Sequence, residues 1–215
     1  MRSIGILGGT FNPPHLGHLA VARHAREELG LECVVLMPAG SPLHKPAAED
    51  PGASCRLAMC SLAAETVEGL SACAMEVDRG GPSYTVDTLR AIHATHPNAE
   101  LTFIVGADTA GTLASWREPV ELLGLARLAV ASRSGADREQ VLDTVAGLAG
   151  GDSQARERLT SRVGFLTMGT IEASSSSVRE RASRGERVEE LVGPTVAAYI
   201  AEHELYRSGA REAIG

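Results

Sequence analysis

Short apolar segments alternate with helical patterns along most of this chain. The first apolar segment, Ser3 to Leu7, precedes a helical pattern over His15 to Gly30, and a second apolar segment, Glu32 to Pro38, follows it. The apolar runs have the length of buried strands, and the stretch between them repeats its apolar residues with the period of a helix. A strand, a helix and a strand in this order favour a parallel pair with a right-handed crossover.

The same alternation continues toward the C-terminus. Further strands are predicted over Ser71 to Asp78, Glu100 to Asp108, Arg127 to Arg133 and Arg162 to Met168, and further helices over Cys55 to Thr66, Thr85 to Pro97 and Asp137 to Gly150. This pattern indicates an α/β domain with a doubly wound, mainly parallel sheet. In such sheets, ligands bind beyond the carboxyl ends of the strands, near the point where the winding reverses.

The strand pattern stops before the C-terminal part of the chain. From Ser176 to Tyr206 two helices are predicted, and the stretch around Gly150 to Gln154, rich in Gly, Ser and charge, is predicted to be a mobile surface segment. We therefore expect a single domain, 1–215, made of an α/β core, 1–172, and a small C-terminal helical region, 173–206.

The composition argues against several classes of protein. The formal net charge of -7 disfavours a general affinity for nucleic acid or anionic membranes, which depends on clustered Lys and Arg. The apolar stretch at the N-terminus is too short for a signal peptide, and no run reaches the ~18 apolar residues of a membrane span, so we expect a cytoplasmic protein. The four cysteines contain no CxxC pair, and no structural zinc, disulfide or other protein-held metal is predicted.

The stretch "GGTFNPPHLGHL", Gly8 to Leu19, lies where the first predicted strand ends. Its glycines allow a tight turn with exposed N–H groups, and its two prolines stiffen the entry into the helix. His15 and His18 then lie on one face at the helix N-terminus, where free N–H groups and the helix dipole favour an anion. Gly17, between them, lets a phosphate approach closely.

Three other interpretations of this stretch are weaker. A dinucleotide-binding turn needs GxGxxG spacing and an acidic residue at the end of the second strand, and this chain has neither. Two histidines three residues apart need further ligands to hold a metal. A helix cap with two surface histidines stays open from the stretch alone, although the Gly-Gly-Thr-Phe before it disfavours that interpretation.

The residues "GGTFNPPHLGH" resemble the signature of the HxGH nucleotidyltransferase superfamily and, more narrowly, that of the bacterial nicotinate-nucleotide adenylyltransferases. The resemblance extends from Ile4 to Tyr206, with no motif residue assigned between Gly135 and Arg162. It implies a Rossmann-like nucleotidyltransferase fold. The HxGH motif alone indicates the reaction class and not the substrate.

A second match, "ASSSSVRERASRG" from Ala173 to Gly185, follows the last predicted strand and opens a helix. It resembles the superfamily's ISSTxxR motif, with Ala173, Ser176 and Val178 in place of isoleucine, threonine and isoleucine. A linker is the alternative for a serine run. Serines that cap a helix, however, turn hydroxyls and amides toward an anion, which Arg179, one turn further on, also reaches. The resemblance implies binding of the β and γ phosphates of ATP.

Three further stretches narrow the family. The stretch "SPLHKP" carries Lys45, which the resemblance puts close to the reacting phosphates, and "GPSYTVDTL" carries Tyr84 and Thr85 at a helix start. In "GADTAGTLASWRE", the resemblance implies that Asp108 contacts the adenylate ribose or nearby phosphates and that Trp116, the one tryptophan of the chain, stacks on the pyridine ring. A solvated lysine, ordinary helix capping and a tryptophan in the core are the alternatives.

The implied reaction transfers the adenylyl group of ATP, with Mg²⁺ accompanying ATP, to nicotinate mononucleotide. Its products are nicotinate adenine dinucleotide and pyrophosphate, in NAD biosynthesis. The implied catalytic residues are His15, His18, Lys45 and Arg179. The implied ATP-binding residues are Gly8, Gly9, Thr10, Phe11, His18, Gly106, Asp108, Ser174, Ser175, Ser176 and Arg179. The implied residues for nicotinate mononucleotide are Asn12, Lys45, Tyr84, Thr85, Trp116 and Arg133.

Two other functions stay open from the sequence. One is an adenylyltransferase for another phosphate monoester, such as nicotinamide mononucleotide or phosphopantetheine, and the other is a nucleotide-binding sensor without catalysis. The expected partners are the small molecules ATP and nicotinate mononucleotide, with no nucleic acid or membrane. The sequence leaves assembly into a homo-oligomer open.

Overall fold

The computed structural model describes residues 2–41, 49–132, 135–167 and 173–207. Its centre is a six-stranded sheet in the order β3-β2-β1-β4-β5-β6, in which every neighbouring pair is parallel. The strands are β1 (Ser3–Gly9), β2 (Cys33–Pro38), β3 (Leu70–Ala72), β4 (Glu100–Gly106), β5 (Arg127–Ser132) and β6 (Val163–Thr167). The winding reverses between β1 and β4, so their carboxyl ends lie side by side. The predicted doubly wound α/β fold is confirmed.

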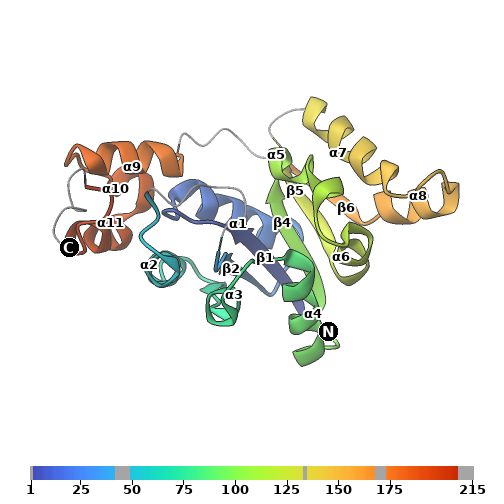
Figure 1. Cartoon of the computed structure of the whole chain (residues 1–215), viewed down its shortest axis with the longest axis horizontal. Coiled ribbons are helices and arrows are strands. Elements are labelled where there is room, and N and C mark those ends of the chain that lie inside the picture. The colour runs from blue at the N-terminus through green and yellow to red at the C-terminus, as the bar shows by residue number, and fades with distance from the viewer. Residues whose placement is uncertain (1, 42–48, 133–134, 168–172, 208–215) are drawn as a thin grey trace.

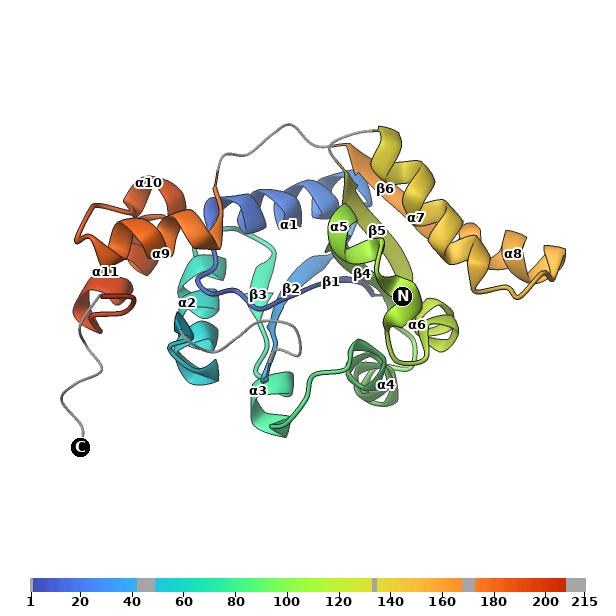
Figure 2. The same cartoon turned by 45° about the horizontal axis from the view of Figure 1, so that its top comes forward.

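Helices cover both faces of this sheet (Figure 1, Figure 2). One face packs against α1 (Leu16–Glu28) and α2 (Ala53–Ala64), and the other against α4 (Thr85–Thr95), α6 (Pro119–Leu125), α7 (Gly135–Gly147) and α8 (Ser153–Thr160). Successive strand residues supply the two faces: Ile6 and Phe103 belong to one buried cluster, and Leu7 and Ile104 to the other. Because both faces of the sheet are covered, the strands are built from continuous apolar runs.

The C-terminal region consists of α9 (Ser175–Ser183), α10 (Glu189–Val192) and α11 (Pro194–Glu202). These helices lie at one end of the molecule, and α7 and α8 lie at the other end in both views (Figure 1, Figure 2). Val178, Leu191 and Val196 share a buried cluster with Leu36 of β2 and Met59 of α2. The C-terminal helices thus pack beside α2, at the end of the molecule nearer β2 than β6. The division of the chain at residue 173 stays a prediction.

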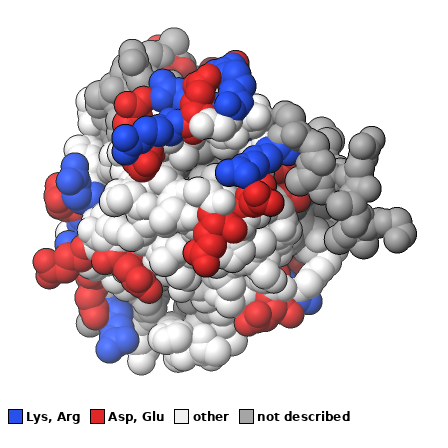
Figure 3. Space-filling model, turned by 90° about the vertical axis from the view of Figure 1, so that its left-hand side faces the viewer, with Lys and Arg blue, Asp and Glu red and all other residues white. Residues whose placement is uncertain are grey.

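The end formed by these helices faces the viewer in Figure 3, where Lys and Arg side chains lie beside Asp and Glu side chains. Arg184 pairs with Glu180 at 2.8 Å and with Glu186 at 2.6 Å. Exposed pairs of this kind contribute little to stability, because water and salt screen the charges. They leave the charge on this face locally mixed, which is a poor match for the phosphate backbone of a nucleic acid. No helix in the described ranges is long and apolar enough to cross a membrane.

Several local predictions are wrong. The predicted strand Ser71 to Asp78 ends at Ala72, and Met75–Arg79 forms the helix α3. β3 is an edge strand that pairs with β2 alone, so little holds the chain in the sheet beyond Ala72, and acidic residues at the start of α3 suit a helix N-terminus. The C-terminal region has three helices where two were predicted.

The helix α8 was also not predicted. The stretch that precedes it, predicted to be mobile, turns through Gly150 and Gly151 at φ 58 and 94. Asp152 then caps α8 by accepting hydrogen bonds from the N–H groups of Gln154 and Ala155. A turn glycine pair followed by a capping aspartate is the local signal that sequence reasoning overlooked. The mobility of this stretch stays a prediction.

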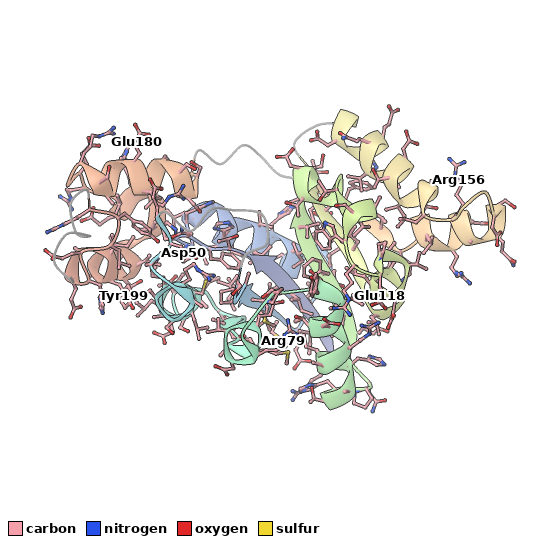
Figure 4. The ribbon with its side chains drawn as sticks, viewed as in Figure 1. Asp50, Arg79, Glu118, Arg156, Glu180 and Tyr199 are labelled. Atoms are coloured by element: carbon pink, nitrogen blue, oxygen red, sulfur yellow. The ribbon has the colours of Figure 1, made fainter. Side chains whose placement is uncertain are left out.

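Arg56 on α2 joins the carboxyl ends of β1 and β2 from inside the molecule. Its side chain is only 1% exposed. The guanidinium donates to the carbonyls of Thr10 at 3.0 Å, Ala39 at 2.6 Å and Gly40 at 2.9 Å, and to the carboxylate of Asp50 at 2.9 Å. Figure 4 shows Asp50 between the C-terminal helices and α2. A buried charge with this many acceptors fixes the two loops that leave β1 and β2.

We predict that Arg56→Met lowers the free energy of unfolding by about 2–4 kcal/mol, because three partly buried carbonyls and the partly buried carboxylate of Asp50 lose the guanidinium as their donor. Urea denaturation of the full chain measures this loss. Arg156, an exposed arginine on α8 (Figure 4), is the matched control, and Arg156→Met should change stability by less than about 0.5 kcal/mol. Equal stabilities for the two variants would contradict the role of Arg56.

Candidate active site

A cavity of about 1460 Å³ opens at the carboxyl edge of the sheet, where β1 and β4 end. Its walls come from the loops after β1, β4 and β5, from the segment before α4 and from the start of α9. Most of the predicted site residues line it: Gly8, Gly9, Thr10, Phe11, Asn12, His15, His18, Tyr84, Thr85, Gly106, Asp108, Trp116, Ser175 and Arg179. Lys45 and Arg133 lie outside the described residues. Segments far apart in the sequence therefore meet in one cavity.

The carboxyl end of β1 depends on two glycines, Gly8 and Gly9, because aromatic rings pack against them. A Cβ at Gly8 would lie 2.8 Å from the Phe103 ring, and one at Gly9 would lie 3.1 Å from the Phe11 ring. Phe11 is buried and adopts a positive φ of 50°, which side chains other than glycine seldom do. Its ring meets the ring of His18 edge-on, with centroids 4.9 Å apart. The turn is thus packed rigidly against the sheet, with the backbone of Gly8 and Gly9 exposed to the cavity.

His15 and His18 lie one above the other at the start of α1. His15 is the N-cap residue, and the two ring centroids are 3.7 Å apart. The N–H of His15 donates to Nδ1 of His18 at 3.2 Å, so a neutral His18 ring carries its proton on Nε2. That nitrogen is then a hydrogen-bond donor of the kind a phosphate oxygen accepts.

Gly17 is required by the way His15 folds back. A Cβ at Gly17 would lie 2.8 Å from Nδ1 and 2.9 Å from Cε1 of His15, closer than real Cβ atoms come. Burial lowers the pKa of His15 from its ordinary value of 6.5 to about 4, and among the described residues Nδ1 of this ring has no hydrogen-bond partner. His15 is therefore neutral at pH 7 in the ligand-free protein, with a buried polar atom that lacks a partner.

The start of α9 is fastened to the turn before α1. Ser174 caps α9 by accepting from the N–H of Ser177, and the hydroxyl of Ser175 donates to the carbonyl of Pro13 at 2.9 Å. Arg179 donates to the carbonyl of Asn12 at 2.8 Å. The N-termini of α1 and α9, where helix dipoles favour anions, are thereby brought to the same end of the cavity.

Two of the predicted phosphate-binding serines do not line the cavity themselves. The hydroxyl of Ser174 is used in the helix cap, and that of Ser176 accepts from Arg179 at 3.4 Å. Arg179 also donates to the carboxylate of Glu49 at 2.6 Å. An anionic ligand at this end would compete with Glu49 for the guanidinium.

The other end of the cavity carries the tryptophan. Trp116 is partly exposed and packs edge-on against Phe103, with ring centroids 6.1 Å apart. Its indole N–H donates to the hydroxyl of Thr112 at 3.0 Å, which fixes the plane of the ring. Trp116 therefore has the half-buried position of a ring that can stack on a ligand, while part of it also supports the core.

A cluster of charged residues ties the tryptophan loop to α4. Arg117 lies over the ring of Tyr84, 4.9 Å from its centroid, and contacts the carboxylate of Asp87 at 3.3 Å. Arg90 of α4 binds Asp87 at 3.0 Å and also binds Glu118. In Figure 4, Glu118 lies beside α4 and α6, well apart from Asp50. Two separate sets of side chains thus support the two ends of the cavity.

Sequence reasoning missed several residues of the cavity wall. Glu76 is only 8% exposed and accepts a hydrogen bond from Thr88 at 2.7 Å, and Arg79 also donates to that hydroxyl. The predicted strand over Ser71 to Asp78 gives no signal that Glu76 lines the cavity. Among the described residues, no group of three or more His, Cys, Asp or Glu side chains could hold a metal ion.

We predict that the ring signals of His15 titrate with a pKa of about 4 in the ligand-free chain, as two-dimensional NMR across the acidic range would measure. In Gly17→Ala the added Cβ pushes the ring toward water, so the pKa rises toward 6.5. Loss of the assigned signals in His15→Gln identifies the residue. A wild-type ring that already titrates near 6.5 would contradict the buried position.

Comparison with known proteins identifies the family of this chain. The family model described as cytidylyltransferase-like matches residues 6–181. Curated relatives include the probable nicotinate-nucleotide adenylyltransferases of Synechococcus sp. (strain JA-3-3Ab), 39% identical over 95% of each chain, and of Salinibacter ruber, 35% identical over 95% of this chain and 98% of that one.

Solved structures share the fold. The Plasmodium falciparum nicotinic acid mononucleotide adenylyltransferase complexed with NaAD superposes with a TM-score of 0.72 at 16% identity, covering 96% of this chain and 98% of that one. At this identity the likeness concerns the fold alone, whereas the curated relatives match in sequence over nearly their full length. The chain therefore belongs to the cytidylyltransferase-like family and, within it, to the nicotinate-nucleotide adenylyltransferases.

Proposed function

We propose that the cavity binds ATP and nicotinate mononucleotide and joins them to nicotinate adenine dinucleotide, with release of pyrophosphate, as a step of NAD biosynthesis. The observation that carries this proposal is the fastening of α9 to the turn before α1, through Ser175 to Pro13 and Arg179 to Asn12. This contact brings two helix N-termini, a histidine pair and a guanidinium to one end of a cavity whose other end has a tryptophan. The names of the curated relatives support the same reaction.

The reaction needs charge to be held more than it needs a base. An oxygen of the mononucleotide phosphate forms a bond to the α-phosphorus of ATP, and the bond from that phosphorus to its bridging oxygen breaks. A phosphate monoester is already anionic at neutral pH, so no strong base has to remove a proton. Negative charge accumulates on the departing pyrophosphate, which preorganised donors and cations stabilise.

We assign the donors accordingly. Nε2 of His18 donates to the α-phosphate, and His15 contacts the phosphate chain. Arg179 provides a fixed positive charge when the ligand replaces Glu49 as its partner. Lys45 lies outside the described residues, and its place close to the reacting phosphates stays a prediction. An arriving phosphate raises the pKa of His15, because a nearby negative charge favours the imidazolium. Burial thus lowers the pKa of His15, whereas a bound phosphate raises it.

A magnesium ion fits this site as a companion of the triphosphate. Mg²⁺ commonly binds through substrate phosphates and water, so the proposal needs no cluster of three protein ligands, and none is present among the described residues. When bound, it would neutralise part of the charge on the phosphates. Asp108 is exposed on the cavity wall, and we assign its carboxylate to the adenylate ribose or to the nearby phosphates.

The mononucleotide lies toward the tryptophan in this proposal. Trp116 stacks on the pyridine ring, with Tyr84 and Thr85 at the start of α4 beside it, and Arg133 stays a prediction outside the described residues. Asn12, also assigned to this substrate, has its side chain bonded to Tyr206 and to the backbone of Glu49. A cytoplasmic location likewise stays a prediction.

The experiment that tests the function incubates the full chain with ATP, Mg²⁺ and one acceptor, and measures pyrophosphate. We expect release with nicotinate mononucleotide and much slower release with nicotinamide mononucleotide or phosphopantetheine. His18→Ala should lower the rate by ~10² to 10⁴ without loss of fold, since one such group contributes on that scale. Turnover only with phosphopantetheine would reject nicotinate mononucleotide as the substrate. No turnover with any acceptor would favour a nucleotide-binding sensor. Normal turnover of a folded His18→Ala chain would reject the assignment of His18.

For Trp116→Ala we expect KM for nicotinate mononucleotide to rise about tenfold, the scale of one lost stacking contact, with little change in KM for ATP. Steady-state kinetics with each substrate varied in turn measure both values. Trp116→Phe, which keeps an aromatic face, is the matched control and should retain most of the affinity. Equal effects on both substrates would mean that the indole only supports the core.

A further inference from the structure

Tyr206, close to the end of the described chain, reaches the turn before α1. It follows α11 and lies beyond the residues 6–181 that the family model matches. Its hydroxyl donates to Oδ1 of Asn12 at 2.7 Å, across a separation of 194 residues. The last described segment of the chain therefore contacts the turn that leads into the histidine pair.

The backbone around Tyr206 is strained. Glu204 and Tyr206 adopt positive φ values of 50 and 66°, in the left-handed region that side chains other than glycine avoid. Leu205 and Tyr206 pack against the buried cluster that holds the C-terminal helices. Strain persists only where surrounding contacts impose it, and here those contacts bring the phenol to Asn12.

The phenol is suited to act as a donor. Burial raises the pKa of Tyr206 well above its ordinary value of 10, so the hydroxyl keeps its proton. The charges of Arg179, Asp50 and Arg56 act on it as well, which agrees with a position between the start of α9 and the loops that Arg56 fixes. A hydroxyl that stays protonated holds the carbonyl oxygen of the Asn12 side chain toward itself.

Three polar groups of Asn12 are held by partners. Oδ1 accepts from Tyr206, Nδ2 donates to the carbonyl of Glu49 at 3.3 Å, and the main-chain carbonyl accepts from Arg179 at 2.8 Å. The donor from Tyr206 decides which way the amide faces, because only that orientation satisfies both side-chain bonds. Asn12 is two residues before Pro14 and three before His15, so its placement sets where α1 begins.

We propose that Tyr206 is a positioning residue, which acts through Asn12 to fix the turn that presents His15 and His18 to the phosphates. The proposal rests on the function proposed above. It assigns the C-terminal segment a part in the chemistry although that segment does not line the cavity.

Tyr206→Phe removes only the hydroxyl and keeps the packed ring. We expect kcat to fall by ~3- to 10-fold, the effect of one neutral hydrogen bond, with KM for ATP changed less than about twofold. The loss falls on kcat because a shifted turn misaligns the histidines with the reacting phosphorus. Tyr199→Phe is the matched control, since Tyr199 is on α11 and stacks on His203 away from the cavity wall, and it should keep wild-type kinetics.

A double mutant tests whether Tyr206 acts through Asn12. Asn12→Ala should lower kcat by itself, and adding Tyr206→Phe to it should lower kcat no further, because the partner is already gone. Two full and independent losses would overturn the proposal. So would a Tyr206→Phe chain that melts at a lower temperature but keeps wild-type kcat, since that result describes a purely structural tyrosine.

A readout without turnover separates this proposal from the proposed function. In the ligand-free chain, Tyr206→Phe should shift the NMR ring signals of His15 and His18, and Tyr199→Phe should leave them in place. Unchanged histidine signals in Tyr206→Phe would overturn the positioning role. Wild-type chain that releases no pyrophosphate from ATP and nicotinate mononucleotide would instead reject the proposed function, whatever the histidine signals do.

Discussion

The junction between the turn before α1 and the start of α9 is the contact on which the cavity depends. Ser175 and Arg179 bind consecutive carbonyls, those of Pro13 and Asn12. Each helix N-terminus alone would attract an anion weakly, and the proposed phosphate site rests on two of them lying close together beside the guanidinium of Arg179. The sheet supplies the frame for this junction, since the turn leaves β1 at the point where the winding reverses.

In the proposed reaction, a chain with a net negative charge has to bind the negatively charged phosphates of ATP. The formal net charge is -7, and the cavity wall itself includes Glu49, Asp50 and Glu76. Some of these carboxylates are engaged by neighbours: Asp50 binds Arg56, and Glu49 binds Arg179. Binding then depends on local donors and not on the overall field, so ATP can be attracted without a general affinity for nucleic acid.

The fold was predictable because its signals are local. Runs such as Ser3 to Leu7 are apolar on both faces, and each helix that follows repeats with the proper period. The errors occur where the local signal is weak. The short edge strand β3 pairs with one neighbour only, so the strand ends at Ala72 although the alternating pattern of the sequence extends further. Helix α8 depends on one capping aspartate, Asp152, inside a stretch that is otherwise typical of a loop.

The candidate site was predictable in part for a related reason. The histidines, the serine run and the tryptophan stand in compact motifs, and the structure brings the described members of these motifs to one cavity or, for Ser174 and Ser176, beside it. Arg56, Glu76 and Tyr206 stand in no such motif. Their significance comes from partners far away in the sequence, as in the contact of Tyr206 with Asn12, and only the folded arrangement reveals it.

Hydrogen–deuterium exchange of the full chain with a non-hydrolysable ATP analogue tests the central claim most directly. The first N–H groups of a helix have no carbonyl four residues earlier within that helix, so a bound triphosphate should slow the exchange of those that no cap occupies. The account predicts slower exchange in two separate segments at once, the start of α1 around His15 to Leu19 and the start of α9 around Ser175 to Arg179. Protection confined to one of these segments, or located at the opposite end of the sheet, would contradict it.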